Sequence, residues 1–265
     1  MVLLEEFALN TIRIEHAERW ATVYLNRPNR RNALNTELLN ELRAALTDLE
    51  SNAAVRVVVL TGEGKAFCSG LDLEELQRMH QKSFEESLAD SRRYADLLKQ
   101  IYLYPKPVIA ALNGPAIAGG CGLASVCDLV VAARSARLGY TEAKIGFVAA
   151  IVSYFLVRNV GEKTARDLLF TARHIGAEEA YRLGLVNEIV EDTELLTRVR
   201  ELSQQLSANS AQSIRASKAL LARTVSPDLD KALDYACELN ARSRSSADCI
   251  EGVAAFLEKR PPKWV

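Results

Sequence analysis

The sequence has almost no net charge, and this excludes one class of partner. Its 33 lysines and arginines are balanced by 34 aspartates and glutamates over 265 residues. Proteins that bind nucleic acids or membrane surfaces usually carry a strong positive field. We therefore expect no nucleic-acid and no membrane partner, and the composition favours a small-molecule ligand.

The sequence also lacks the motifs of a metal site. The three histidines, His16, His80 and His174, are scattered, and no two cysteines are separated by two residues. Metal sites draw several ligands from short, fixed spacings, so we expect no metal. The five cysteines are odd in number and lie in apolar surroundings, which is typical of free thiols in a reducing compartment. We therefore predict a cytoplasmic protein.

One uncharged run is long, but its content argues against a membrane span. Residues 107–127 carry no charge and are long enough to cross a bilayer. They also contain two prolines and four glycines, which would break a spanning helix in several places. We predict that this run forms a buried strand, a tight loop and a short helix.

Alternating strand and helix patterns predict an α/β fold. Apolar, β-branched runs at 55–60 and 108–112 are typical of strands buried on both faces of a sheet. Helical patterns at 72–79 and 83–102 lie between them, which predicts parallel strands joined by helical crossovers. After a last strand at 186–190, we expect only helices.

The order of these elements predicts two parts. We expect the strands and the site in residues 1–191 and an all-helical region in residues 192–265. A run of helices at the end of an α/β unit usually packs on something other than its own sheet, and another subunit is the natural candidate. The helical region is therefore predicted to mediate oligomerisation.

Two loops have the features of a site that uses backbone amides. Residues 65–72 and 113–122 each follow a buried strand, are rich in small residues and open a helix. The first N–H groups of a helix have no partner within it, and the helix dipole is positive there. Such a loop can hold an anion or a developing oxyanion.

Neither loop matches a phosphate-binding motif. In the first, Val59 and Ala66 stand where a P-loop needs a glycine and a serine or threonine. In the second, Gly120-Cys121-Gly122 is followed by Ser125 at the third glycine position of a dinucleotide fingerprint. Nucleotide binding is therefore not favoured.

At these loops the chain resembles the crotonase superfamily, the enoyl-CoA hydratase/isomerase family. The resemblance runs in order and with family spacing from about residue 12 to residue 259. It is carried by Asn26-Arg27-Pro28, Asn32-Ala33-Leu34, residues 65–72, residues 106–114, Ala118-Gly119-Gly120-Cys121, Cys127-Asp128, Thr141-Glu142, Ile145-Gly146 and Gly184-Leu185-Val186.

The resemblance implies a fold, a substrate class and an assembly. The fold would be a spiral of ββα turns, and the C-terminal helices would build a homotrimer or a hexamer of two trimers. The substrate would be an acyl-CoA thioester, with coenzyme A as part of the substrate and no separate cofactor. The backbone N–H groups of Cys68 and Gly119 would grip the thioester oxygen and form the oxyanion hole.

The resemblance also assigns substrate contacts. Residues of the two loops would lie beside the acyl-CoA, and a C-terminal pair would reach the coenzyme A of a neighbouring subunit. The loop residues are Ala66, Ser69, Gly70, Leu71, Gly120 and Gly122, and the pair is Phe256 and Lys259.

Only one of the two glutamates that hydratases of this family normally carry is present. Glu142 stands at the later position, followed by Ile145 and Phe147, which would remove water from a carboxylate and raise its pKa. Gly122 stands at the earlier position, and we expect the missing side chain to leave a space that holds a water or a branch of the substrate. Asp72 is the only other nearby acid, and we expect it to cap the following helix.

This departure leaves three functions open. Water addition to a 2-enoyl-CoA is favoured by the resemblance, which includes methylglutaconyl-CoA hydratases. Isomerisation of a 3-enoyl-CoA to a 2-enoyl-CoA needs only one base, so Glu142 alone would suffice. A catalytically weak acyl-CoA-binding oligomer is the third alternative.

Overall fold

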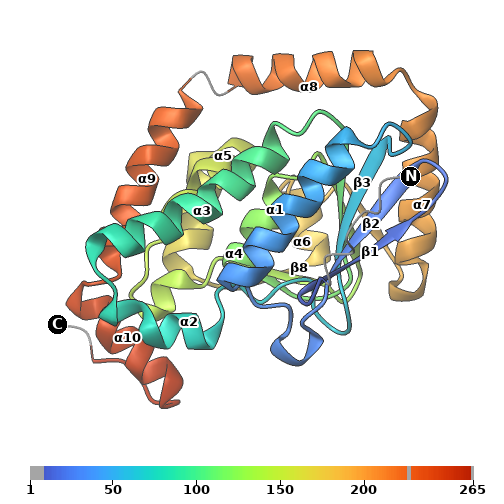
Figure 1. Cartoon of the computed structure of the whole chain (residues 1–265). Coiled ribbons are helices and arrows are strands. Elements are labelled where there is room, and N and C mark those ends of the chain that lie inside the picture. The colour runs from blue at the N-terminus through green and yellow to red at the C-terminus, as the bar shows by residue number, and fades with distance from the viewer. Residues whose placement is uncertain (1–8, 226–227, 264–265) are drawn as a thin grey trace.

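The computed structural model describes residues 9–225 and 228–263, and it contains two mixed sheets with helices around them (Figure 1). In the larger sheet, the first strand is antiparallel to the second and all other neighbours are parallel. Its order is β1 (Ile12–His16), β2 (Trp20–Leu25), β3 (Val57–Gly62), β4 (Val108–Leu112), β6 (Leu129–Ala133) and β9 (Glu188–Val190).

The smaller sheet has three short strands that the sequence pattern did not predict. They are β5 (Ala116–Ile117), β7 (Arg137–Gly139) and β8 (His174–Gly176). Strands of two or three residues are too short to show a hydrophobic period. The chain passes from β4 to β5 and from β6 to β7, so it repeatedly leaves the larger sheet for the smaller one and returns. The predicted α/β class is confirmed.

Ten α-helices and four 3-10 turns complete the described part of the chain. The helices that precede the last strand are α1 (Thr36–Ser51), α2 (Leu73–Arg78), α3 (Phe84–Tyr102), α4 (Gly119–Ser125), α5 (Ala150–Thr171) and α6 (Ala177–Arg182). The C-terminal helices are α7 (Leu195–Ala208), α8 (Ala211–Val225), α9 (Leu229–Ser243) and α10 (Ala247–Leu257). The 3-10 turns are η1 (Pro28–Arg30), η2 (Met79–Gln81), η3 (Glu142–Ile145) and η4 (Asp192–Glu194).

The central strands of the larger sheet, β3 and β4, are buried on both faces, as their apolar runs predicted. Val58 and Leu60 of β3 face the main core, which includes the apolar sides of α1 and α3. Val57 and Val59 face the other way and pack with Leu195 of α7. The strand expected at 55–60 is therefore present, although it runs two residues later.

The C-terminal helices do not all leave their own subunit's sheet. Because α7 covers the second face of the larger sheet, the expectation that this region packs elsewhere is wrong for α7. Helix α9 packs on α3 and α5, and α10 packs on η3 and α2. Helix α8 runs along the top of the molecule in Figure 1, and its Lys218 pairs with Asp128 (2.7 Å). The division at residues 191 and 192 stays a prediction, and its outermost residues, 1–8 and 264–265, lie outside the described residues.

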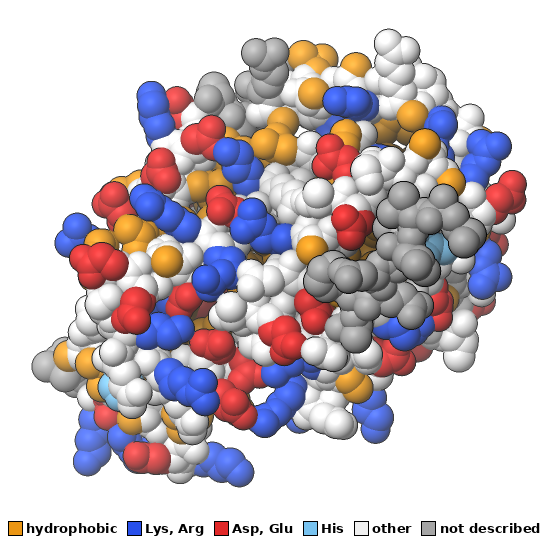
Figure 2. Space-filling model, in the orientation of Figure 1, with side chains coloured by type: hydrophobic (Ala, Val, Ile, Leu, Met, Phe, Trp, Pro, Cys, Tyr) orange, Lys and Arg blue, Asp and Glu red, His pale blue; other side chains and the backbone are white. Residues whose placement is uncertain are grey.

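The uncharged run at 107–127 forms the strand, loop and short helix that its content predicted. It supplies β4, β5 and α4. Across residues 9–225 and 228–263, no helix is long and apolar enough to cross a membrane. On the face shown in Figure 2, basic and acidic side chains are interspersed, as the near-zero net charge predicts.

Candidate active site

The second glycine loop presents a free backbone amide. Between β5 and α4 the chain turns at Ala118, whose φ of 50° and ψ of −120° are rare for a residue with a Cβ. The Ala118 amide donates to the Gly139 carbonyl (2.7 Å) and holds this turn in place. The next amide, that of Gly119, has no acceptor among the described residues.

The first loop lies against the second. Cys68 forms an isolated parallel bridge with Ala116, in which the Ile117 amide donates to the Cys68 carbonyl (2.9 Å). The Cys68 amide is directed at the Pro115 carbonyl at 3.2 Å, the long end of the normal range. The two predicted oxyanion amides therefore lie on adjacent segments, but only that of Gly119 is free.

Two of the predicted contact residues are glycines because the loops approach so closely. A Cβ on Gly120 would lie 2.2 Å from the Cys68 carbonyl oxygen. Gly70 has a φ of 86°, and a Cβ there would lie 3.0 Å from the Ile117 carbonyl oxygen. Their first role is therefore to let the loops meet.

Glu142 is the first residue of η3 and is buried, with only 7% of its surface exposed. It is therefore no surface helix cap. Its Oε2 is buried and has no hydrogen-bond partner among the described residues. Burial raises the pKa of Glu142 from its ordinary value to about 7, as the apolar neighbours predicted. An acid with this pKa can both accept and return a proton near neutral pH.

A cavity of about 800 Å³ joins these groups. Five of the predicted residues line it: Ser69, Leu71, Gly119, Glu142 and Phe256. The other predicted residues are not part of its wall. Of these, Ala66, Cys68, Gly70, Gly120 and Gly122 are buried, and Lys259 is exposed outside it.

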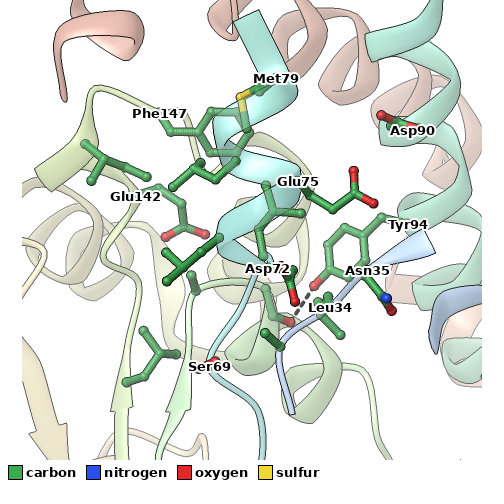
Figure 3. A pocket seen from close by; sticks show the side chains of 18 of the residues that line it. Leu34, Asn35, Ser69, Asp72, Glu75, Met79, Asp90, Tyr94, Glu142 and Phe147 are labelled. Atoms are coloured by element: carbon green, nitrogen blue, oxygen red, sulfur yellow. Dashed lines mark hydrogen bonds between the residues drawn. The ribbon is translucent and has the colours of Figure 1, made fainter. Parts of the chain in front are cut away.

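The space predicted at Gly122 is absent. A Cβ on Gly122 would lie 2.3 Å from Tyr94 Oη and 2.4 Å from Val152 Cγ1. The prediction that a water or a substrate branch occupies this place is wrong, because protein atoms fill it. Tyr94 lies on α3, and its hydroxyl donates to the Gly119 carbonyl (2.6 Å; Figure 3). Nothing in the local sequence points to Tyr94, which is distant from Gly122 along the chain.

The outer part of the cavity is lined by ionic groups that no sequence pattern predicted. Asp90, one turn before Tyr94 on α3, accepts hydrogen bonds from Lys82 (2.6 Å), Arg93 (2.9 Å) and Arg244 (3.4 Å). Lys82 also lies 3.3 Å from Glu75. Arg244 Nε is buried and has no hydrogen-bond partner among the described residues. Three cations therefore face two carboxylates, and one guanidinium retains donor capacity.

A second acid, a thiol nucleophile and a metal centre find no support among the described residues of this site. Asp72 caps α2 through Glu74 N (2.9 Å), as predicted, and pairs with Arg27 (2.8 Å), so it is not available as a second acid. Burial raises the pKa of the Cys68 thiol to about 12, so it is not an ionised nucleophile at neutral pH. In the described part of the chain, no three histidine, cysteine or acidic side chains are grouped to hold a metal ion.

Nearly the whole chain matches one protein family and its named relatives. The sequence profile of a family described as Enoyl-CoA hydratase/isomerase matches residues 15–265. A Thermus thermophilus protein provisionally named an enoyl-CoA hydratase is 49% identical over 244 residues, which cover 92% of this chain and 96% of the relative. A crotonyl-CoA hydratase of Syntrophomonas wolfei is 35% identical, with 97% of this chain and 99% of its own covered.

Solved structures agree with the sequence match. The crystal structure of an enoyl-CoA hydratase/isomerase from Xanthobacter autotrophicus has a TM-score of 0.88 at 30% identity, covering 94% of this chain and 93% of that one. The two sheets and the C-terminal helices thus recur in that structure, and the predicted crotonase-like fold is confirmed.

Proposed function

The chain belongs to the enoyl-CoA hydratase/isomerase family of enzymes, and we propose that it adds water to the 2,3 double bond of a 2-enoyl-CoA thioester. One observation carries the proposal. The buried Glu142 carboxyl group, which has an oxygen without a hydrogen-bond partner and has no basic partner, shares a cavity with an amide that has no acceptor among the described residues. The names of the two hydratases described above point to the same reaction.

The amides stabilise the charge that develops on the thioester oxygen. In this proposal the Gly119 N–H is the principal donor because it is free. The Cys68 N–H is the second donor, and it is shared with the Pro115 carbonyl through the 3.2 Å contact. Loss of one such donor typically costs about 3–4 kcal/mol of transition-state stabilisation, so two fixed amides suffice to make an enolate accessible.

Glu142 moves the proton. As a carboxylate it accepts a proton from the attacking water, and as a carboxylic acid it then delivers that proton to C2 of the enolate. A pKa of about 7 suits both steps near neutral pH. Tyr94 and Tyr140 lie near the Glu142 charge, and burial raises the pKa of each well above its usual value. Both phenols therefore stay neutral and do not compete for the proton.

The outer cavity supports a finer proposal about the acyl group. A short acyl chain that ends in a carboxylate, as in a methylglutaconyl-CoA-like substrate, would meet Arg244 and Lys82 at its far end. A guanidinium with an unpaired Nε–H forms a strong hydrogen bond with a carboxylate. An apolar chain end beside it would leave the charged donor without a partner, which is unfavourable.

Isomerisation remains the second candidate because one observation favours it. Glu142 is the one acid that the described part of the cavity presents without a basic partner, and moving a double bond requires one base. A binding protein without turnover is the third alternative.

Spectroscopic assays distinguish the three. Crotonyl-CoA, a 3-enoyl-CoA and a saturated acyl-CoA are tested with the wild type, with Glu142→Gln and with the control Glu178→Gln, a surface acid paired with Arg134. We expect rapid hydration that falls about 10²–10⁴-fold in Glu142→Gln and is unchanged in the control. Brisk isomerisation without hydration would replace our proposal with the second candidate, and binding without any turnover would replace it with the third.

We also propose that the helical region, residues 192–265, assembles the protein into a trimer or a hexamer. Its helices expose large apolar side chains, namely Leu196, Leu220, Leu221, Tyr235, Leu239, Ile250 and Phe256. A contiguous apolar surface usually marks a contact with a partner, and the proposal is that these side chains form such a surface. Light scattering coupled to size-exclusion chromatography is expected to give three or six times the 29.2 kDa chain mass, and a monomer would contradict the proposal.

A further inference from the structure

Tyr94 stands where a second acid would have to lie. The side chain of any residue at position 122 starts from its Cβ, and at Gly122 that point is 2.3 Å from Tyr94 Oη. The phenol and a second glutamate therefore exclude one another. The Tyr94 hydroxyl group, which comes from α3, occupies the place of the missing acid.

We propose that the Tyr94 hydroxyl holds the attacking water opposite Glu142 and so replaces the missing acid in positioning but not in proton transfer. This inference rests on the proposed hydration reaction. Glu142 and Tyr94 approach the same cavity from different elements, η3 and α3, as Figure 3 shows.

The hydrogen bond to Gly119 determines whether the Tyr94 hydroxyl can act as a donor or as an acceptor towards a further partner. Its hydrogen is donated to the Gly119 carbonyl at 2.6 Å, so the oxygen can offer only a lone pair to a further partner. A water has two hydrogens, one for the Tyr94 oxygen and one for the Glu142 carboxylate. This leaves a lone pair of the water oxygen directed at neither group and free to attack C3.

Water addition balances in atoms and electrons with a single acid. The bond between the water oxygen and C3 forms, the water proton on the Glu142 side passes to the carboxylate, and the π electrons move to the thioester oxygen. The enolate then takes the same proton from Glu142 at C2 and the carbonyl is restored. Tyr94 gains and loses nothing, which agrees with a phenol whose burial strongly disfavours its ionised form.

The same hydrogen bond ties Tyr94 to the oxyanion loop. The Gly119 carbonyl that accepts from Tyr94 belongs to the residue whose amide is free. A purely structural role would therefore affect every reaction that passes through the enolate. A water-holding role would affect hydration much more than a reaction that needs no water.

The test compares two reactions of one variant. Tyr94→Phe keeps the ring and removes the hydroxyl. Tyr104→Phe is the matched control, because its hydroxyl also donates to a backbone carbonyl, that of Leu46 (2.7 Å), and it does not line the cavity. Hydration of crotonyl-CoA is followed by absorbance, and exchange of the C2 hydrogens of butyryl-CoA in D₂O is followed by NMR.

We expect kcat for hydration to fall about 10–100-fold in Tyr94→Phe, and the ratio of hydration to exchange to fall at least about tenfold. Tyr104→Phe should leave that ratio unchanged. An equal loss of both reactions in Tyr94→Phe, or no loss of hydration, would overturn the role of Tyr94 while leaving the hydratase proposal intact. A wild-type protein that exchanges C2 hydrogens but does not hydrate crotonyl-CoA would overturn both.

Discussion

The two ends of one cavity shift the pKa values of their carboxyl groups in opposite directions. At the inner end, Glu142 is buried without a cation, and burial raises its pKa to about 7. At the outer end, burial alone would raise the pKa of Asp90, but Lys82, Arg93 and Arg244 outweigh it and lower the pKa below its usual value. Glu142 lies deeper than Asp90 and has no basic partner in the described part of the chain, and these two differences together separate the acid that can exchange protons at neutral pH from the one that cannot.

The outer end can be tested first through substrate choice, where we expect a larger effect than on stability. Arg244→Met should lower the ratio of kcat/KM for a carboxylated enoyl-CoA to that for crotonyl-CoA by about 100-fold, because a buried guanidinium no longer meets the carboxylate. Arg242→Met is the control, because Arg242 is exposed and is not among the residues lining the cavity. A ratio that does not change would remove the proposal for a carboxylated acyl group.

The contrast between the two acids also predicts opposite effects on stability. Asp90→Asn leaves three basic side chains without their shared carboxylate. We expect the free energy of unfolding in urea to fall by about 2–3 kcal/mol, somewhat less than for a fully buried pair because Asp90 is partly exposed. Glu178→Gln, on the open surface, should change it by less than about 0.5 kcal/mol. An equal loss of stability in Asp90→Asn and Glu178→Gln would show that the basic side chains around Asp90 add nothing to the stability of the fold.

At the inner end, removing the charge should stabilise the protein. The pKa of Glu142 is about 7 in the folded chain and 4.5 ordinarily, so the folded state binds more protons between these values and loses stability as the pH rises through them. Glu142→Gln abolishes this loss. We expect a gain of about 1–2 kcal/mol at pH 8 that disappears as the pH falls towards 4.5. If Glu142→Gln stabilised the protein equally at pH 8 and at pH 4.5, the assigned pKa would be contradicted.

At the inner end, the contact between positions 122 and 94 can be tested through stability. Gly122→Ala should destabilise the protein because the new Cβ meets Tyr94 Oη and Val152 Cγ1. Tyr94→Phe removes the first of these two contacts. The double variant should therefore be more stable than the sum of the single changes predicts, by about 1 kcal/mol in a double-mutant cycle. Additive effects would mean that the two positions do not compete for the same space.

The sequence predicted the parts of the fold that have a clear period or motif. The strands at β3 and β4 and the cap at Asp72 follow from local pattern, and so does the burial of Glu142. The short strands of the smaller sheet were not predicted because two or three residues are too few to show a hydrophobic period. The packing of α7 on the larger sheet escaped because an apolar helix face does not reveal its partner.

The site was predicted only as far as its motifs extend. The glycine loops and Glu142 lie within continuous patterns. Tyr94 and Arg244 enter the cavity from α3 and from the end of α9, and their neighbours there are distant in the chain. The space expected at Gly122 was wrong for the same reason, since only the tertiary fold shows that Tyr94 fills it.

In the proposed hydration reaction one buried carboxyl group, that of Glu142, which has no basic partner among the described residues, accepts and returns the proton. The most direct measurement is kcat/KM for crotonyl-CoA from about pH 5 to about pH 9. The account predicts a tenfold rise per pH unit on the acid side and a plateau above a single pKa of about 7, with no such limb in the residual rate of Glu142→Gln. A profile that is flat through pH 7, or a limb that persists in Glu142→Gln, would contradict it.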